Sequence, residues 1–261
     1  MPLMLAWWFQ KREGQLRSLD FFVATLLLAV PVGLIVRQPD LGTAILVLSG
    51  GLYVLFFAGL SWRWIVPPIV IGFIGILFIL IFEERLCADG VNWVVLHEYQ
   101  RQRVCTLLDP TNDPLGKGFH ILQGLIAIGS GGFFGKGYFQ GTQTHLEFIP
   151  ERTTDFIFAA YSEEFGFLGA LVLIGTFGFL ILRGLTIALA APTLFTRLLG
   201  GAVTMIFFTY AFVNMGMVSG VLPVVGVPLP FISYGGTAMV TLGLGVGILL
   251  SIAKARRLVQ T

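Results

Sequence analysis

Long runs without a single charged residue constrain this chain more than any other feature. No Asp, Glu, Lys or Arg occurs between Arg197 and Lys254, nor within residues 41–60 and 64–82. A helix needs about 20 apolar residues to cross the hydrocarbon core of a bilayer, so the longest run has room for two spans and a connection. Backbone groups in lipid must bond internally, which leaves helices or closed barrels, and these runs lack the alternation of a barrel strand. The sequence therefore predicts an all-α polytopic membrane protein.

The composition agrees with this class. Charged residues make up 11% of the chain and hydrophobic residues 56%, whereas a soluble domain carries about 25% charged residues. A formal net charge of +2 without a basic run gives no indication of a nucleic-acid partner. The first residues, MPLMLAWWFQKR, lack the pattern of a cleavable signal and read as the end of a span that meets a basic interface. We therefore expect that further spans precede this region of the protein.

Six membrane spans are predicted, at about 20–37, 41–60, 64–82, 156–182, 198–218 and 236–252. Their orientation follows from Lys and Arg in short loops, which favour the cytoplasmic side. With a cytoplasmic N-terminus, the short outer turns hold only Arg37, and the other basic residues of short loops and tails fall inside. The chain is then a single membrane domain, residues 1–261, with both termini inside and residues 83–155 as one long extracytoplasmic loop.

The predicted outer loop carries nine of the fourteen acidic residues, which makes it the best place for chemistry. Within it, residues 121–135 are uncharged but too few to span a bilayer, so we expect a re-entrant or interfacial segment. An oxidising compartment would permit a disulfide between Cys87 and Cys105. Because two cysteines in a loop are often unpaired, free thiols are favoured. Three dispersed histidines lack the spacing of metal ligands; they are His97, His120 and His145.

Carboxylates gather at the start of the fourth predicted span, in the stretch LEFIPERTTDFIFAAYSEEFG. Pro150 suits the first turn of a helix, so the helix is predicted to begin there and Glu147 to lie in the approach loop. Glu151 and Asp155 would then share one helical face, a place that is also ordinary for acids facing a helix dipole. Desolvation and like charges would raise the pKa of Asp155, whereas the dipole and Arg152 would lower it.

Further polar positions remain open between functional and structural roles. Glu163 and Glu164 lie about two turns deeper, where ionisable side chains usually face a cavity or a partner. Asp40, in the turn QPDLGT, either punctuates that turn or takes part in function. The proline-rich segment GVLPVVGVPLPFISYGG, residues 220–236, is either an outer loop or a segment folded into the protein.

Two guanidinium groups are predicted on the outer side. Arg101 and Arg103 stand two positions apart in the stretch YQRQR. A planar guanidinium suits bidentate recognition of phosphate, but the same pair would also bind anionic lipid headgroups or nearby acids. The residues alone leave these uses open.

Taken together, these stretches resemble the SEDS family of cell-wall polymerases (shape, elongation, division and sporulation), and its rod-shape branch in particular. The similar stretches are QPDLGTAILV, YQRQRV, LLDPTNDPLGKGFHILQ, AIGSGG, GKG, FIPERTTDFIFA and EEFG. The longest, NMGMVSGVLPVVGVPLPFISYGGTA at 214–238, is similar to the family's C-terminal signature. The resemblance runs from Arg37 to the C-terminal basic cluster and implies that the family's N-terminal spans are missing from this chain.

The resemblance implies a peptidoglycan glycosyltransferase that polymerises lipid II at the outer face of the bacterial inner membrane during cell elongation and shape maintenance. It also implies a complex with a class B penicillin-binding protein, the transpeptidase, and with other membrane proteins of the elongation complex. In the family, the acid of the TDFIF motif is the catalytic carboxylate, which falls on Asp155 here. The family motif commonly has a histidine where this chain has Thr153, which argues against a role for a histidine next to the base.

The similar motifs also supply candidates for substrate binding: Asp40, Arg101, Arg103, Gln123, Lys136, Glu147 and Glu151. Asp155 is predicted to act as general base, while the arginines or a divalent cation, Mg²⁺ or Mn²⁺, neutralise the leaving pyrophosphate. Glu147 and Glu151 would hold such a cation or orient the acceptor. Two other functions stay open: a lipid flippase or transporter, and a non-catalytic scaffold for the transpeptidase. The acids cluster outside the spans, which favours outer-face chemistry over a transport pathway through the midplane.

Overall fold

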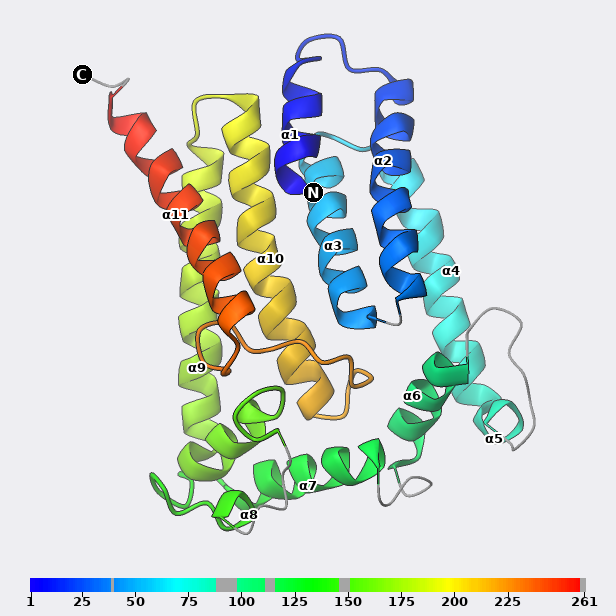
Figure 1. The fold of residues 1–261 in the computed structure, drawn as a ribbon, viewed down its shortest axis with the longest axis vertical. Coiled ribbons are helices and arrows are strands. Elements are labelled where there is room, and N and C mark those ends of the chain that lie inside the picture. The colour runs from blue at the N-terminus through cyan, green and yellow to red at the C-terminus, as the bar shows by residue number, and fades with distance from the viewer. Residues whose placement is uncertain (39, 88–97, 111–115, 146–150, 259–261) are drawn as a thin grey trace. The chain divides into compact units, whose positions relative to one another are not determined.

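The computed structural model describes residues 1–38, 40–87, 98–110, 116–145 and 151–258, and all regular structure in these ranges is helical (Figure 1). The prediction of an all-α fold is therefore confirmed. The helices, in chain order, are α1 (Pro2–Gln10), α2 (Ser18–Arg37), α3 (Leu41–Phe57), α4 (Trp62–Ile81), α5 (Glu83–Leu86), α6 (Glu98–Leu108), α7 (Lys117–Ser130), α8 (Thr142–His145), α9 (Ile157–Leu189), α10 (Leu194–Val218) and α11 (Gly236–Leu258).

Within the described ranges, five helices are long and apolar enough to cross a membrane: α2, α4, α9, α10 and α11. They correspond to five of the six predicted spans. The remaining predicted span, 41–60, corresponds to α3, which has only 17 residues. Gly59 takes a positive φ of 96° and ends this helix before the predicted boundary at residue 60. At 1.5 Å per residue, α3 is about 25 Å long, slightly shorter than a hydrocarbon core of about 30 Å.

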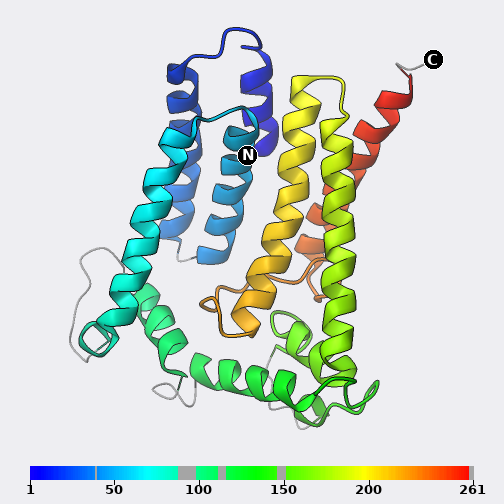
Figure 2. The ribbon, with the colours of Figure 1, turned by 180° about the vertical axis from the view of Figure 1, so that it is seen from behind.

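The chain divides into two compact units, of which the first comprises Met1–Leu60, Leu171–Val213 and Val225–Thr261. Its core is formed by apolar side chains from α1, α2, α3, α10 and α11. Glycines allow close approach inside it, because a Cβ on Gly51 of α3 would lie 2.4 Å from Leu28 of α2. Likewise, a Cβ on Gly184 of α9 would lie 2.4 Å from Thr204 of α10. The C-terminal part of α9 accordingly runs beside α10 in both views (Figures 1 and 2).

The proline-rich segment that follows α10 is folded into the first unit from Val225 onward. It is non-helical, and Val227 and Leu229 are each only 1% exposed. The amide of Leu229 donates to Ser233 Oγ at 2.7 Å, and a Cβ on Gly42 of α3 would lie 2.8 Å from the carbonyl oxygen of Val225. Residues 220–236 were predicted to be either an outer loop or a segment folded into the protein, and the part from Val225 onward is folded in.

The second unit comprises Ser61–Ala170 and Asn214–Val224. It contains α4 to α8, the start of α9 and the end of α10. The predicted interfacial segment, 121–135, forms most of α7 and the turn after it. On α7, Ile121 and Ala127 are buried while Leu125 and Ile126 are exposed, so the helix has an inner face and an apolar outer face.

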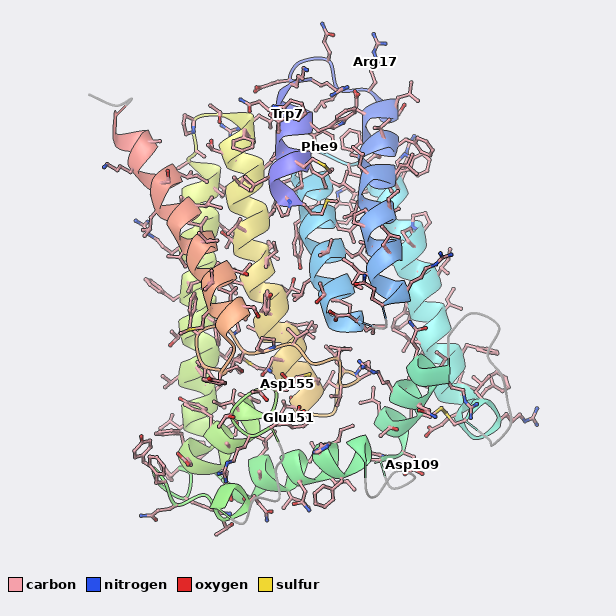
Figure 3. All side chains as sticks on the ribbon, in the orientation of Figure 1. Trp7, Phe9, Arg17, Asp109, Glu151 and Asp155 are labelled. Atoms are coloured by element: carbon pink, nitrogen blue, oxygen red, sulfur yellow. A yellow bond between two sulfur atoms is a disulfide. The ribbon has the colours of Figure 1, made fainter. Side chains whose placement is uncertain are left out.

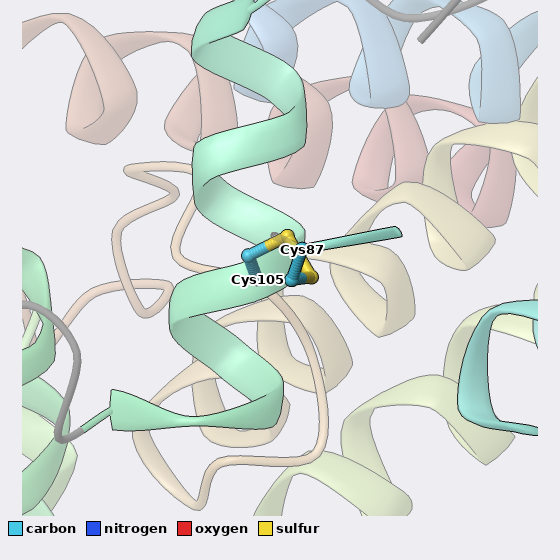
Figure 4. Close-up of a disulfide and its surroundings, with 2 residues drawn as sticks. All are labelled: Cys87 and Cys105. Carbon is cyan, nitrogen blue, oxygen red and sulfur yellow. A yellow bond between two sulfur atoms is a disulfide. The ribbon is translucent and has the colours of Figure 1, made fainter. Parts of the chain in front are cut away.

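A disulfide joins Cys87, just after α5, to Cys105 on α6 (Figure 4). The prediction of free thiols is therefore wrong. The cysteines are 18 positions apart, and the fold brings their Cα atoms to 5.7 Å, within the range that a disulfide requires. Sequence spacing alone does not show that α6 turns Cys105 toward the end of α5.

Candidate active site

Asp155 lies in a turn ahead of α9, in the second unit. Glu151 takes a positive φ of 57°, and its carbonyl accepts hydrogen bonds from the amides of Thr154 at 3.0 Å and Phe156 at 3.2 Å. Residues 151–156 are therefore a hydrogen-bonded turn, and α9 begins at Ile157. The prediction that the helix begins at Pro150 and carries Glu151 and Asp155 on one helical face is wrong, because a left-handed residue at 151 interrupts helical geometry; Pro150 itself lies outside the described residues.

The two carboxylates nevertheless interact; both residues are labelled in Figure 3. Partial burial raises the pKa of Asp155, and the negative charge of Glu151 together with a side-chain hydrogen bond to Glu151 raises it further. A hydrogen bond between two carboxyl groups needs one shared proton, which explains why the pair favours the protonated form. Of the opposing influences on Asp155 considered from the sequence, desolvation and like charge dominate.

The main chain of Asp155 is fixed from the end of α10. Asn214, which is fully buried, donates from Nδ2 to the carbonyl oxygen of Asp155 at 2.9 Å. This contact was not predicted, although Asn214 opens the 214–238 signature and is the only carboxamide residue between Arg197 and Lys254. A buried side-chain amide in a charge-free stretch needs a hydrogen-bond partner. This requirement is the sequence signal that could have identified Asn214 as part of the site.

The next residue, Phe156, anchors the turn on α7. Its side chain is 1% exposed, and its ring lies 5.9 Å from that of His120. A Cβ on Gly124 would lie 3.3 Å from Phe156 and 3.6 Å from the carbonyl of Val218, so the absence of a side chain at 124 lets three elements meet. Thr153 stands in place of the family's histidine, and the structure puts a different histidine, His120, against the neighbouring ring.

Arg103 and Arg101 lie on α6 of the same unit. Arg103 donates from Nη1 to the carbonyl oxygen of Val224 at 3.0 Å, and Arg101 is only 8% exposed. The segment from Asn214 to Val224 thus bonds the main chain of Asp155 near one end and the Arg103 guanidinium at the other. One Nη of Arg103 is engaged in this structural contact, which leaves the remaining donors of its guanidinium for other acceptors.

Lys136 and Glu163 form an ion pair. Lys136 Nζ lies 2.7 Å from Glu163 Oε1, and the Glu163 side chain is fully buried. The same oxygen accepts from Thr142 Oγ1 at 3.1 Å and from the Gln143 amide at 3.0 Å. The prediction that Glu163 faces a cavity or a partner is confirmed, with Lys136 as the partner. Because its ammonium is committed to this carboxylate, Lys136 has a structural role that its prediction as a substrate ligand did not include.

The remaining candidates occupy separate places. Gln123 is half-buried on α7. Asp40 belongs to the first unit, where its Oδ1 accepts from the Thr43 amide at 2.9 Å and caps α3. Glu147 lies outside the described residues, as does His97. Among the residues that are described, no group of three His, Cys, Asp or Glu side chains is placed to hold a metal ion.

Comparison with known proteins places this arrangement among the cell-wall synthesis proteins. The family described as "Cell cycle protein", which covers FtsW, RodA and SpoVE, matches residues 1–258. The peptidoglycan glycosyltransferase MrdB of Escherichia coli K12 is 49% identical over all of this chain and 67% of its own length. The stage V sporulation protein E of Bacillus subtilis is 36% identical over 86% of this chain and 57% of its own length. The chain thus spans about two thirds or less of these relatives.

Solved structures agree. A peptidoglycan synthase complex, studied for how it coordinates polymerization and crosslinking, contains a chain with a TM-score of 0.74 and 34% identity, over 98% of this chain and 68% of that one. The rod shape determining protein RodA of Thermus thermophilus gives a TM-score of 0.57 at 29% identity, over 95% of this chain and 62% of that one.

Proposed function

Because this chain belongs to the FtsW/RodA/SpoVE family of cell cycle proteins, we propose that it is a peptidoglycan glycosyltransferase that polymerises lipid II with Asp155 as general base. The assignment rests on the position, the pKa and the main-chain hydrogen bond of Asp155. It lies in the family's TDFIF motif, its pKa is raised by burial and by Glu151, and Asn214 fixes its main chain. A base with a raised pKa binds a proton more strongly, which favours proton abstraction from a hydroxyl once the group is ionised.

The reaction follows from these groups. The Asp155 carboxylate takes the proton from the 4-hydroxyl of the acceptor GlcNAc while that oxygen attacks the anomeric carbon of the donor MurNAc. The bond from this carbon to the phosphate oxygen breaks, and its electron pair leaves with the polyprenyl pyrophosphate. This leaving group departs as an anion, so one base suffices and no second carboxyl group is needed as general acid.

Neutralising the leaving pyrophosphate requires positive charge. Arg101 and the free donors of the Arg103 guanidinium are candidates on α6, and Gln123 is a candidate for contacts to the sugars or peptide. A divalent cation, Mg²⁺ or Mn²⁺, would be held by Glu151, with Glu147 as the other candidate ligand, since Mg²⁺ is commonly bound by one or two carboxylates together with substrate phosphates. When bound, such a cation would stabilise the charge that develops on the leaving group. Asp40 and Glu147 remain candidates for substrate contacts.

The cellular setting is proposed on the same basis. A multi-pass protein of the bacterial inner membrane, with both termini cytoplasmic, would present residues 83–155 and the Asp155 turn to the outer face, where lipid II is polymerised. A peptidoglycan synthase complex among the solved relatives supports a class B penicillin-binding protein as the partner that crosslinks the product. Other elongation-complex membrane proteins and the surrounding lipids complete the expected partners.

The test is Asp155→Asn in the protein extended to the full length of its relatives, purified with its transpeptidase partner and supplied with fluorescent lipid II. Glycan chains are separated on a gel. Loss of a general base is expected to slow polymerisation about 10²- to 10⁴-fold. Glu164→Gln, a half-buried acid outside the proposed site, is the matched control and should retain activity. If Asp155→Asn polymerised lipid II as the parent does at normal protein levels, the assignment of Asp155 as general base would be wrong.

The same assay separates the two other functions. If this chain were only a scaffold and the partner polymerised lipid II, the complex would consume lipid II equally with the parent protein and with Asp155→Asn. If neither protein polymerised, no variant would consume lipid II. A transporter needs polar groups through the midplane, whereas α3 carries no charged residue, and α4 and α10 carry only Arg63 and Arg197 near their first residues. Glu163, the acid buried inside α9, is already paired with Lys136.

A further inference from the structure

Six aromatic side chains gather where the loop after α7 meets the first turns of α9, and all are exposed. This aromatic cluster consists of Phe133, Phe134, Tyr138, Phe139, Phe165 and Phe167. Ring centroids are 5.9 Å apart between Phe133 and Phe167, and 6.2 Å apart between Tyr138 and Phe165. The loop and the helix therefore make aromatic contacts at two places, both on the exposed surface, and proteins in water rarely expose so many apolar side chains together without a partner.

Four backbone hydrogen bonds fix the loop to α9. The amides of Lys136 and Gly137 donate to the carbonyls of Glu163 and Glu164, each at 3.0 Å. In the opposite direction, the amides of Phe167 and Leu168 donate to the carbonyls of Gly132 and Phe133, at 2.9 and 3.1 Å respectively. The donors and acceptors on α9 are available because Gly166, with φ 65° and ψ −165°, breaks the helix there. The aromatic cluster consequently has a fixed height on this helix.

At the level of the aromatic cluster, the sequence of α9 changes from acidic residues to a charge-free stretch. Glu163 and Glu164 are followed by a charge-free stretch, 165–182, which ends at Arg183. At 1.5 Å per residue this stretch is about 27 Å long, close to the roughly 30 Å of a hydrocarbon core. One boundary of the hydrocarbon therefore falls beside Phe165, where the aromatic cluster lies. Aromatic side chains are enriched at membrane–water interfaces because their rings tolerate both environments.

We propose that the aromatic cluster is a membrane anchor that inserts into the lipid interface at the N-terminal end of α9. Its partner is the phospholipid bilayer, because the cluster continues the exposed apolar surface of a candidate membrane span through Leu168. The one cation within the loop, Lys136, is neutralised by Glu163, so the surface offers no charge to an acidic protein. The anchor fixes the depth of α9, and with it the height of the turn at 151–156 above the hydrocarbon. It does not depend on the reaction proposed above.

Spin labelling tests the anchor. The sequence has two cysteines and both are in the disulfide, so a cysteine introduced by Phe134→Cys is the single thiol that a nitroxide reagent modifies. The labelled chain, residues 1–261, is placed in nanodiscs of phosphatidylethanolamine and phosphatidylglycerol. Collisions of the label with oxygen, which concentrates in lipid, are compared with collisions with a water-soluble nickel chelate. Ile74→Cys on the exposed face of α4 gives the lipid reference, and Thr153→Cys, exposed in the turn, gives the water reference.

The oxygen-to-nickel ratio at residue 134 is expected to be several-fold above that at 153 and to approach that at 74. A ratio equal to that at 153 would place the cluster in water and overturn the proposal. Poor access to both reagents would show that protein covers the cluster and would overturn it too. Phe139→Cys repeats the measurement in the same cluster if the first variant does not fold; both rings are exposed, Phe134 at 78% and Phe139 at 64%.

Discussion

Gly166 is the residue at which a single methyl group should do the most damage to the second unit. It breaks α9 with a φ of 65° and a ψ of −165°, a backbone conformation that is nearly restricted to glycine. A Cβ at this position would lie 2.3 Å from the amide nitrogen of Gly135 and 2.8 Å from the carbonyl oxygen of Phe133. Both neighbours are backbone atoms, so no side-chain rotation relieves the clash.

The expected cost of Gly166→Ala is the sum of two effects. Holding a non-glycine residue in this conformation costs about 1–3 kcal/mol. Moving the loop away to relieve the clash breaks the hydrogen bonds from Phe167 and Leu168 to the loop carbonyls, each worth about 1 kcal/mol. The variant should therefore lose about 3–5 kcal/mol of stability, which corresponds to a fall of roughly 6–20 °C in the unfolding midpoint.

The assay is the unfolding midpoint of the purified protein in detergent, followed by fluorescence-detected size-exclusion chromatography after heating. Gly175→Ala and Gly178→Ala are matched controls in the same helix, because nothing lies within 4 Å of a Cβ at either position. Alanine is the better helix former by about 0.5–1 kcal/mol, so the controls should match or exceed the parent. A midpoint for Gly166→Ala within error of these controls would refute the reasoning.

Three further outcomes are expected. Glu151→Gln removes the charge that raises the pKa of Asp155, so the acid limb of the polymerisation rate should move to lower pH; an unmoved limb or a shift to higher pH would contradict the coupling. Lys136→Met leaves Glu163 buried without its cation and should lower the stability by about 3–5 kcal/mol. Adding Glu163→Gln to this variant should restore part of the lost unfolding midpoint. If the two substitutions instead lowered the midpoint additively, the ion pair would be contradicted. Asn214→Ala removes the donor to the Asp155 carbonyl and should lower kcat about 10-fold with KM unchanged, if about 1.4 kcal/mol of positioning is lost; a change confined to KM would assign the residue to substrate binding instead.

The membrane helices were predictable because their signal is strong. Charge-free runs long enough to cross a bilayer leave the chain few alternatives, and the observed α2, α4, α9, α10 and α11 follow them. The ends of helices were harder to predict. Gly59 shortens α3, and the positive φ of Glu151 delays α9 beyond Pro150, because local turn geometry decides a helix end more than composition does.

Contacts between distant segments were the part that sequence reasoning missed. Cys87 and Cys105 looked like two unrelated thiols, since their pairing depends on how α6 folds back toward α5. Lys136 looked available to a substrate, because its partner lies 27 positions away on α9. In the sequence, Asn214 is only the start of a signature, whereas in the structure its partner is the main chain of Asp155 itself. Each of these interactions is fixed by tertiary packing, which periodicity and spacing do not encode.

The bond from Asn214 to Asp155 has a consequence for how the protein is made. Asn214 follows Asp155 by 59 positions, and ribosomes add about 5–20 residues per second, so the donor emerges roughly 3–12 s after the turn that it holds. During that interval the ribosome is still producing the rest of α9 and most of α10. The turn with its two carboxylates is therefore synthesised several seconds before the buried amide that fixes its main chain, so the site is completed only after most of α10 has been made.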